Sequence, residues 1–384
     1  MGERVEFDSR VKKLLKVEIK PAVACATLRE DWLDLENRAD ATVFLSWQWL
    51  GHWLNVYKPN AIVLHVTEGD RLVGLGLVVE ADERRHGVLK SRCLRLHQTG
   101  HKLLDQIWIE YNGFLAERGK EDAVARACLE HLCSAMPGWD EFILGAIDAD
   151  EADRYARITG LYKHLRWEAP CFGVDLDGLR RSGDHYLDTL SRNTRHQINR
   201  AHRLYGERGE VKLVRPDSVE GALAVFDAIG PRHLERWGHG PDQSGFANPD
   251  FVRFHRELIR EQWPEGGVDL ISVMAGDEQI ACFYNLLHNQ VVYFYLGGMS
   301  VETDNRLKPG LVGHSLCIED YRYHGFHYYD FMGGYERYKV NLGHFHRNLV
   351  QIALQRPRFK LKLEDVARRA KNRWLGEASA GNER

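Results

Sequence analysis

The sequence predicts an α/β (α+β) protein built on mixed sheets with crossover helices. Two hairpin-like passages, residues 65–79 (HVTEGDRLVGLGLVV) and 272–287 (SVMAGDEQIACFYNLL), are apolar runs interrupted by Gly-Asp, a dipeptide favoured in tight turns. A helical pattern follows each hairpin, at 123–136 and at 311–324, and runs into an apolar strand. A strand, a helix and a strand in that order require at least one parallel strand pair in each half.

The two hairpins indicate an internal repeat. Gly69 and Gly276 are 207 residues apart (276 − 69), and the same offset places Val66 on Val273. An aromatic-rich helical segment precedes each hairpin, and the crossover helices also match, at a slightly shorter offset. Glycine and apolar residues can match by chance, but two degenerate copies of one helix, hairpin, strand, helix, strand unit account better for all these matches together.

The chain length supports two domains. A single hydrophobic core rarely grows beyond about 250–300 residues, and this chain has 384, of which 44% are hydrophobic and 28% charged. Residues 168–182 contain Pro170 and glycines and show no helical period. We therefore predict an N-terminal domain over 1–170 and a C-terminal domain over 171–384.

Composition excludes several classes of protein and partner. Seven cysteines, without any C-x-x-C pair, argue against a disulfide framework or a zinc ribbon, and no metal site is expected. A net charge of −3 gives no general attraction to nucleic acid or acidic membranes. No apolar stretch is long enough to span a bilayer, and the first residues do not resemble a signal peptide. We expect a cytoplasmic protein, with the inner membrane surface as an alternative location.

A basic helix is predicted over 186–205. One face is apolar, and the opposite face carries arginines with almost no interleaved acid: Arg192, Arg195, Arg200 and Arg203. This face is either an ordinary solvated surface, paired with acids elsewhere, or an anion site, for which the arginine fork suits phosphate. In the second interpretation it borders the cleft between the halves, with Arg192 and Arg195 as substrate-binding residues.

The crossover at 291–334 predicts a phosphate site. A strand at 291–296 leads through a polar loop to a helix that opens at Pro309, and a helix N-terminus attracts pyrophosphate through its free N–H groups and dipole. The predicted donor-binding residues around this turn are Arg306, Lys308, Gly310, Leu311 and Gly313. The alternative is a plain strand-to-helix connection whose glycines serve packing.

Four passages, SRNTRHQINR, FANPDFVRFHRELI, RLKPGLVGH and YYDFMGGYERYK, resemble the GNAT-like acyltransferases of the CelD-like group. That group is often found with bacterial exopolysaccharide and cell-envelope genes and is related to the Fem-type aminoacyl transferases. The resemblance is strong over about 180–350 and weaker over about 25–170. It implies tandem GNAT-like (acyl-CoA N-acyltransferase) folds, with the donor pyrophosphate at the helix opening at Pro309. The family pattern there has an Arg or Gln three residues before the first glycine, whereas Arg306 precedes Gly310 by four.

The resemblance also implies a reaction. An amine of a cell-envelope or exopolysaccharide precursor would attack acyl-coenzyme A directly in a ternary complex, with no tightly bound cofactor. The candidate proton-transfer residues are Asp330, His233 and Tyr295, which could instead be a turn cap, a core histidine and a core aromatic residue. The resemblance further assigns Lys339 to the donor and Arg236, Trp237 and Tyr335 to substrate.

Three other functions fit the sequence. The basic helix favours an aminoacyl-tRNA donor, which the net charge disfavours, so nucleic acid is an unlikely partner. An amphipathic pattern over 356–375 favours peripheral membrane contact and a lipid acceptor such as a sphingoid amine. The imperfect donor pattern would also fit a non-catalytic binding module that retains the fold.

Overall fold

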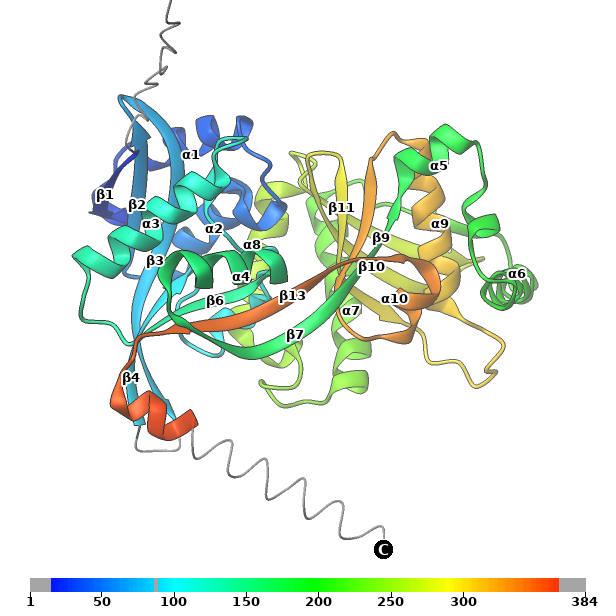
Figure 1. Ribbon diagram of the computed structural model, residues 1–384. Helices are drawn as coiled ribbons and strands as arrows, with labels where there is room; N and C mark the ends of the chain where they lie inside the picture. The colour runs from blue at the N-terminus through cyan, green and yellow to red at the C-terminus, as the bar shows by residue number, and fades with distance from the viewer. Residues whose placement is uncertain (1–14, 86–88, 366–384) are drawn as a thin grey trace, which may run out of the picture.

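The computed structural model describes residues 15–85 and 89–365, and its two halves are built from the same series of elements (Figure 1). The N-terminal half contains, in chain order, β1 (Leu15–Pro21), η1 (Ala22–Ala24), α1 (Leu28–Asn37), η2 (Val43–Leu45), α2 (Trp47–Tyr57), β2 (Ala61–Glu68), β3 (Arg71–Arg85), β4 (Leu89–Leu96), η3 (Leu104–Ile107), β5 (Leu115–Ala116), α3 (Glu121–Ala135), β6 (Glu141–Asp148), α4 (Ala149–Thr159) and β7 (Tyr162–Asp175).

The C-terminal half follows the same plan after a short helical insertion. Its elements are α5 (Leu176–Ser182), η4 (Tyr186–Thr189), α6 (Arg192–Gly206), β8 (Val211–Val214), α7 (Val219–Trp237), η5 (Gly245–Ala247), α8 (Pro249–Gln262), β9 (Val268–Ala275), β10 (Glu278–His288), β11 (Val291–Met299), α9 (Pro309–Tyr323), β12 (Tyr328–Gly333), α10 (Arg337–Leu342) and β13 (His344–Gln355).

The predicted duplication is confirmed by the positions of the hairpins. β2 and β9 begin 207 residues apart (268 − 61), and so do β3 and β10 (278 − 71). β3 is the third strand from one end of the sheet and β10 the third from the other. The turns agree as well, since Gly69 and Gly276 both have left-handed backbone conformations, with φ of 65° and 60°. The predicted crossover helices correspond to α3 and α9.

All the strands belong to one mixed sheet, in the order β1-β2-β3-β4-β6-β13-β7-β12-β11-β10-β9-β8, with β5 beside β3. The halves exchange their last strands. β13, from the C-terminal half, pairs with β6, whereas β7, from the N-terminal half, pairs with β12. β7 and β13 also pair with each other along their length, and Figure 1 shows both crossing from one half to the other. Residue 170, the predicted domain boundary, therefore lies inside a strand that both halves use.

Two local predictions around this boundary need correction. Residues 168–182 are the end of β7 and then α5, a helix of seven residues that is too short to show a sequence period. The helix predicted over 186–205 begins instead at Arg192, because the Ser191 side chain accepts the N–H of Thr194 and caps a new helix after the turn of η4. α6 then packs against α9 and β8 at the outer end of the C-terminal half (Figure 1).

The halves also meet through α2 and α8, the equivalent aromatic-rich helices that precede the hairpins. The rings of Trp49 and Phe254 lie 5.2 Å apart, and those of Tyr57 and Phe254 lie 5.4 Å apart and stacked. Trp49 also contacts Tyr295 of β11, at 5.7 Å. This aromatic cluster, buried apart from the half-buried Tyr57, fixes the N-terminal half against the strand that forms one wall of the site.

In the part of the chain that the structure describes, no helix is both long enough and apolar enough to span a lipid bilayer. Residues 359–365 are helical, and Phe359 and Leu363 on this stretch are 76% and 53% exposed. The rest of the amphipathic pattern predicted to contact membranes, beyond residue 365, lies outside the described residues.

Candidate active site

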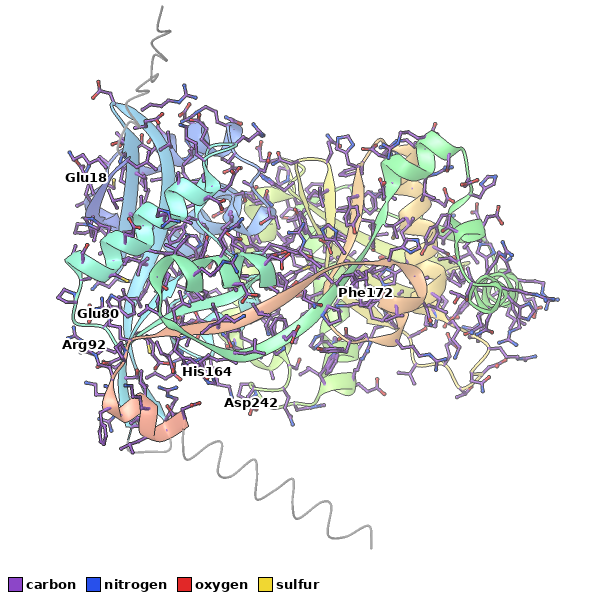
Figure 2. The ribbon with its side chains drawn as sticks, in the orientation of Figure 1. Glu18, Glu80, Arg92, His164, Phe172 and Asp242 are labelled. Carbon is purple, nitrogen blue, oxygen red and sulfur yellow. The ribbon has the colours of Figure 1, made fainter. Side chains whose placement is uncertain are left out.

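A cavity of about 840 Å³ lies where the two halves meet. The N-terminal half contributes residues 102–110, and the C-terminal half contributes the end of α7 with the loop after it, the second part of β11, the start of α9, and the segment from β12 to α10. Asp242, on the loop after α7, marks the lower side of the molecule in Figure 2.

The cavity exists because two parallel strands diverge. β11 and β12 pair only from Val291 with Tyr328 to Tyr293 with Asp330. Beyond that point β11 carries an extra residue, Tyr295, relative to β10, since Tyr284 is opposite Leu296 and Asn285 is opposite Phe294. Backbone N–H and C=O groups on this edge of β11 have no partner strand in the described structure, so a ligand lying between the strands can bond them.

The start of α9 forms the end of the cavity. Pro309 is in the first turn of the helix, Lys308 precedes it, and the first turn contains no acid. A Cβ added at Gly310 would come no closer than 3.5 Å to Met299, which leaves the helix N-terminus open to a ligand. In the equivalent helix of the N-terminal half, α3, the first turn carries Glu121 and Asp122, which repel an anion. Of the two crossover helices, only α9 suits pyrophosphate.

The predicted donor-binding residues divide into two groups. Lys308, Gly310 and Leu311 line the cavity. Gly313 instead faces the sheet, because a Cβ there would lie 2.7 Å from the ring of Phe283, so its close approach serves packing and not the donor. Arg306 lies outside the cavity lining and bonds Asp304 through Nε and Nη2, at 2.9 and 2.7 Å from one carboxylate oxygen.

Glu110 is the most distinctive group in the cavity, and the sequence analysis did not identify it. It comes from the N-terminal half, and its Oε2 accepts the backbone N–H of Gly333 at 2.8 Å. Burial raises its pKa to about 7, helped by the charges of Asp330 and Glu336 and opposed by the Gly333 bond and Lys339. A carboxyl group with a pKa near the working pH is suited to general-base catalysis.

Backbone strain concentrates around Glu110. Trp108, Tyr111 and Met332 all have left-handed conformations, with φ of 44°, 50° and 62°, although none is glycine. Such conformations cost about 1–3 kcal/mol each and persist where the surrounding structure requires them, often at active sites. The strained residues flank Glu110 in sequence or, in the case of Met332, precede the glycine that bonds it.

The three sequence-predicted proton-transfer residues have other surroundings. Asp330 is buried, with a pKa raised to about 6 by desolvation, and does not line the cavity. His233 lines the cavity, with Nδ1 2.8 Å from Ser244 Oγ, and burial together with Arg236 lowers its pKa to about 4. Tyr295 also lines the cavity, but its hydroxyl donates to the carbonyl of Ile107, and burial raises its pKa well above the ordinary value.

The remaining predicted substrate and donor residues fall inside and outside the cavity. Arg236 lies 5.0 Å from the centre of the Trp237 ring, and both line the wall. Lys339 is buried at the cavity, where its Nζ donates to the carbonyl of Gly333 at 2.6 Å. Tyr335 is 71% exposed and outside the lining.

The basic face of α6 does not border the cavity. Arg192 is exposed, and Arg195 bonds Asp188 at 2.8 Å. None of the arginines on this face contributes to the cavity lining. The face therefore lies outside the cavity, which differs from the predicted position in the cleft. The described residues also contain no cluster of side chains that could hold a metal ion.

Known proteins resemble this chain in part of its sequence and in its fold. Residues 192–340 match the family described as Acetyltransferase (GNAT) domain. In structure, the chain resembles FemX (11% identity, 88% of this chain and 98% of that chain, TM-score 0.59). It also resembles a conserved Bacteroides thetaiotaomicron protein of unknown function (12%, 89% and 100%, TM-score 0.54) and L-PGS from Bacillus licheniformis (10%, 88% and 96%, TM-score 0.52). No curated protein matches the sequence.

The fold consists of two GNAT-like units joined in one mixed sheet, and the family match over residues 192–340 supports an acyltransferase. The matched family covers the part of the chain that contains α9 and most of the cavity wall. The similar structures, at these low identities, support the fold alone.

Proposed function

We propose that the protein is a coenzyme A-dependent N-acyltransferase that acts in the cavity between its halves. The observation that carries this proposal is the placement of Glu110, with its raised pKa, in the same cavity as the anion-binding start of α9. The pyrophosphate of acyl-coenzyme A would lie at Gly310 and Lys308, and the thioester between β11 and β12. No tightly bound cofactor is needed.

The reaction is direct transfer in a ternary complex. The neutral amine attacks the thioester carbonyl, the C–N bond forms, and Glu110 accepts the proton that the nitrogen must lose. Unpaired backbone N–H groups of β11 stabilise the oxyanion. The C–S bond then breaks, and the coenzyme A thiolate leaves and takes up a proton.

For the acceptor, we propose an amine of a cell-envelope or exopolysaccharide precursor, in a bacterial cytoplasm. Two exposed indoles, Trp108 and Trp237, line the cavity together with the amide side chains of Gln106 and Gln243. Broad aromatic faces bordered by hydrogen-bonding groups suit a ring that is apolar on its faces and polar at its edge, as an amino sugar is. The resemblance of the sequence to the CelD-like group supports the same acceptor.

An aminoacyl-tRNA donor is the second candidate. The arginines of α6 favour it, since they could contact the phosphates of a tRNA. The exposed Phe359 and Leu363 favour a lipid amine as acceptor at the inner membrane surface. A non-catalytic role fits poorly with a carboxyl group in the cavity whose pKa is about 7.

Calorimetric titration tests the donor. Coenzyme A and acetyl-coenzyme A should both bind the wild-type protein, and Gly310→Val should raise the dissociation constant at least about tenfold. Absence of detectable binding up to millimolar coenzyme A would contradict the proposed donor and favour aminoacyl-tRNA.

A further inference from the structure

Asp330 and Glu110 are two carboxyl groups that approach each other from opposite halves of the chain, but only Glu110 lines the cavity. Asp330 is 5% exposed, and the charge of Asp330 raises the pKa of Glu110. A buried carboxylate costs stability unless it is well hydrogen-bonded, so its bonds show what it does in this position.

Both oxygens of Asp330 hold residues that adjoin Glu110. Oδ2 accepts the hydroxyl of Tyr111, the residue after Glu110, at 2.7 Å. Oδ1 accepts the backbone N–H of Met332 at 2.7 Å. This second bond coincides with the left-handed conformation of Met332 and with the break in register between β12 and β7. The next residue, Gly333, then donates its N–H to Oε2 of Glu110.

We propose that Asp330 is a positioning residue for Glu110, which it holds in place through Tyr111 on one side and through Met332 and Gly333 on the other. This inference rests on the proposed role of Glu110 as the base. It changes the sequence-based interpretation of Asp330, which acts through another carboxyl group and touches no substrate.

The proposal also has an electrostatic side. Three charged residues influence Glu110: Asp330 of β12, Lys339 of α10, and Glu336 of the turn before α10. Asp330 is approached by Arg347 of β13 and by Lys339, both of which favour its ionised form. Burial is the main cause of the raised pKa of Glu110, and the ionised Asp330 raises it further because it disfavours a second negative charge on Glu110.

Two variants separate position from charge. Asp330→Asn keeps the shape and an acceptor for the Met332 N–H while removing the charge, so the pKa of Glu110 should fall. The rising limb of the pH profile of kcat/KM should then move to lower pH, by at least about half a unit. Tyr111→Phe removes the hydrogen bond from the Tyr111 hydroxyl to Asp330. It should lower kcat about tenfold while the KM for acetyl-coenzyme A stays within about twofold.

Tyr321→Phe is the matched control. Tyr321 is also buried, and its hydroxyl donates to Asp269 at 2.7 Å, but neither residue lines the cavity. The Tyr321 hydroxyl also accepts a hydrogen bond from Asn285 Nδ2 at 2.9 Å, and this variant loses both buried bonds. General destabilisation should therefore affect both phenylalanine variants, whereas only Tyr111→Phe should lower kcat.

A readout without catalysis distinguishes this proposal from the proposed function. Thermal unfolding across pH measures the stability difference between wild type and Glu110→Gln. The pH at which this difference is half-developed reports the pKa of Glu110. That midpoint should fall when both proteins also carry Asp330→Asn. If Glu110→Gln retains full turnover while the midpoint still moves, the base role fails but the link to Asp330 stands. An unmoved midpoint, with Tyr111→Phe as active as Tyr321→Phe, would overturn the proposal.

Discussion

Gly333 donates its backbone N–H to Oε2 of Glu110 at 2.8 Å, and this bond joins the last residue of β12 to a loop of the other half of the chain. The two residues are 223 positions apart in sequence. The bond fixes one carboxylate oxygen of a residue that lines the cavity. It therefore places the proposed base of one half against the proposed donor site of the other.

The first prediction concerns the base. Glu110→Gln preserves the size of the side chain but cannot accept a proton, so kcat should fall at least about 100-fold while coenzyme A binds with unchanged affinity. Thiol release from acetyl-coenzyme A in the presence of a panel of amino sugars measures the rate. Asp242→Asn, a change on the same cavity wall, should retain most of the activity. A Glu110→Gln enzyme of wild-type rate would assign the base elsewhere.

The second prediction is the pH dependence of the reaction. Because only the ionised Glu110 accepts a proton, kcat/KM should rise with pH with a midpoint near the pKa of that residue, about 7. His233 should not contribute a limb in this range, since its pKa is lowered to about 4 and it is neutral throughout. A profile that is flat between pH 6 and pH 8 would be inconsistent with Glu110 as the base.

The third prediction is that Glu110→Gln, which should lower activity, raises the stability of the fold at high pH. Glu110 has a folded-state pKa of about 7 against an ordinary value of 4.5, so the stability it contributes below pH 4.5 is lost as pH rises through 7. Above pH 8, Glu110→Gln should therefore be more stable than wild type by about 2–3 kcal/mol, and the difference should vanish at pH 4. Melting temperatures of the two proteins across this range provide the measurement. A wild type more stable than the variant at pH 8 would contradict the burial of this charge.

The repeat, the hairpins and the crossover helices could be predicted because each has a local pattern. Gly-Asp turns and apolar periods occur within about 15 residues, and a common offset connects the copies. The exchange of β7 and β13 has no such pattern, because it depends on pairing between strands far apart in the sequence. A reader of the sequence who does not know of this exchange has no indication that residues 102–110 line a cavity together with the other half.

Glu110 illustrates the same limit at the level of one residue. The only sequence feature that marks it is a single carboxyl group within the apolar run WIEYN, which any strand edge could also contain. Lys308, Gly310 and Leu311 were predicted from the physics of a helix N-terminus, and they do line the cavity. Gly313 was assigned to the donor by the same argument, but it is one turn further along, where the helix faces the sheet.

The fourth prediction uses this pair of glycines. Gly310→Val adds atoms at the open end of α9 and should weaken coenzyme A binding at least about tenfold with little change in melting temperature. Gly313→Val forces atoms into the ring of Phe283 and should instead destabilise the fold by about 1–3 kcal/mol. Calorimetry and thermal unfolding on both variants give the comparison. Equal loss of stability in the two would show that Gly310 is also a packing residue.

A crystal structure of the complex with acetyl-coenzyme A tests the central claim most directly. The account predicts the pyrophosphate at the N-terminus of α9, with the backbone at Gly310 in contact, and the thioester between β11 and β12 on the side of the cavity that Glu110 lines. Coenzyme A bound at α3, or bound at α9 with its thioester remote from Glu110, would contradict the account.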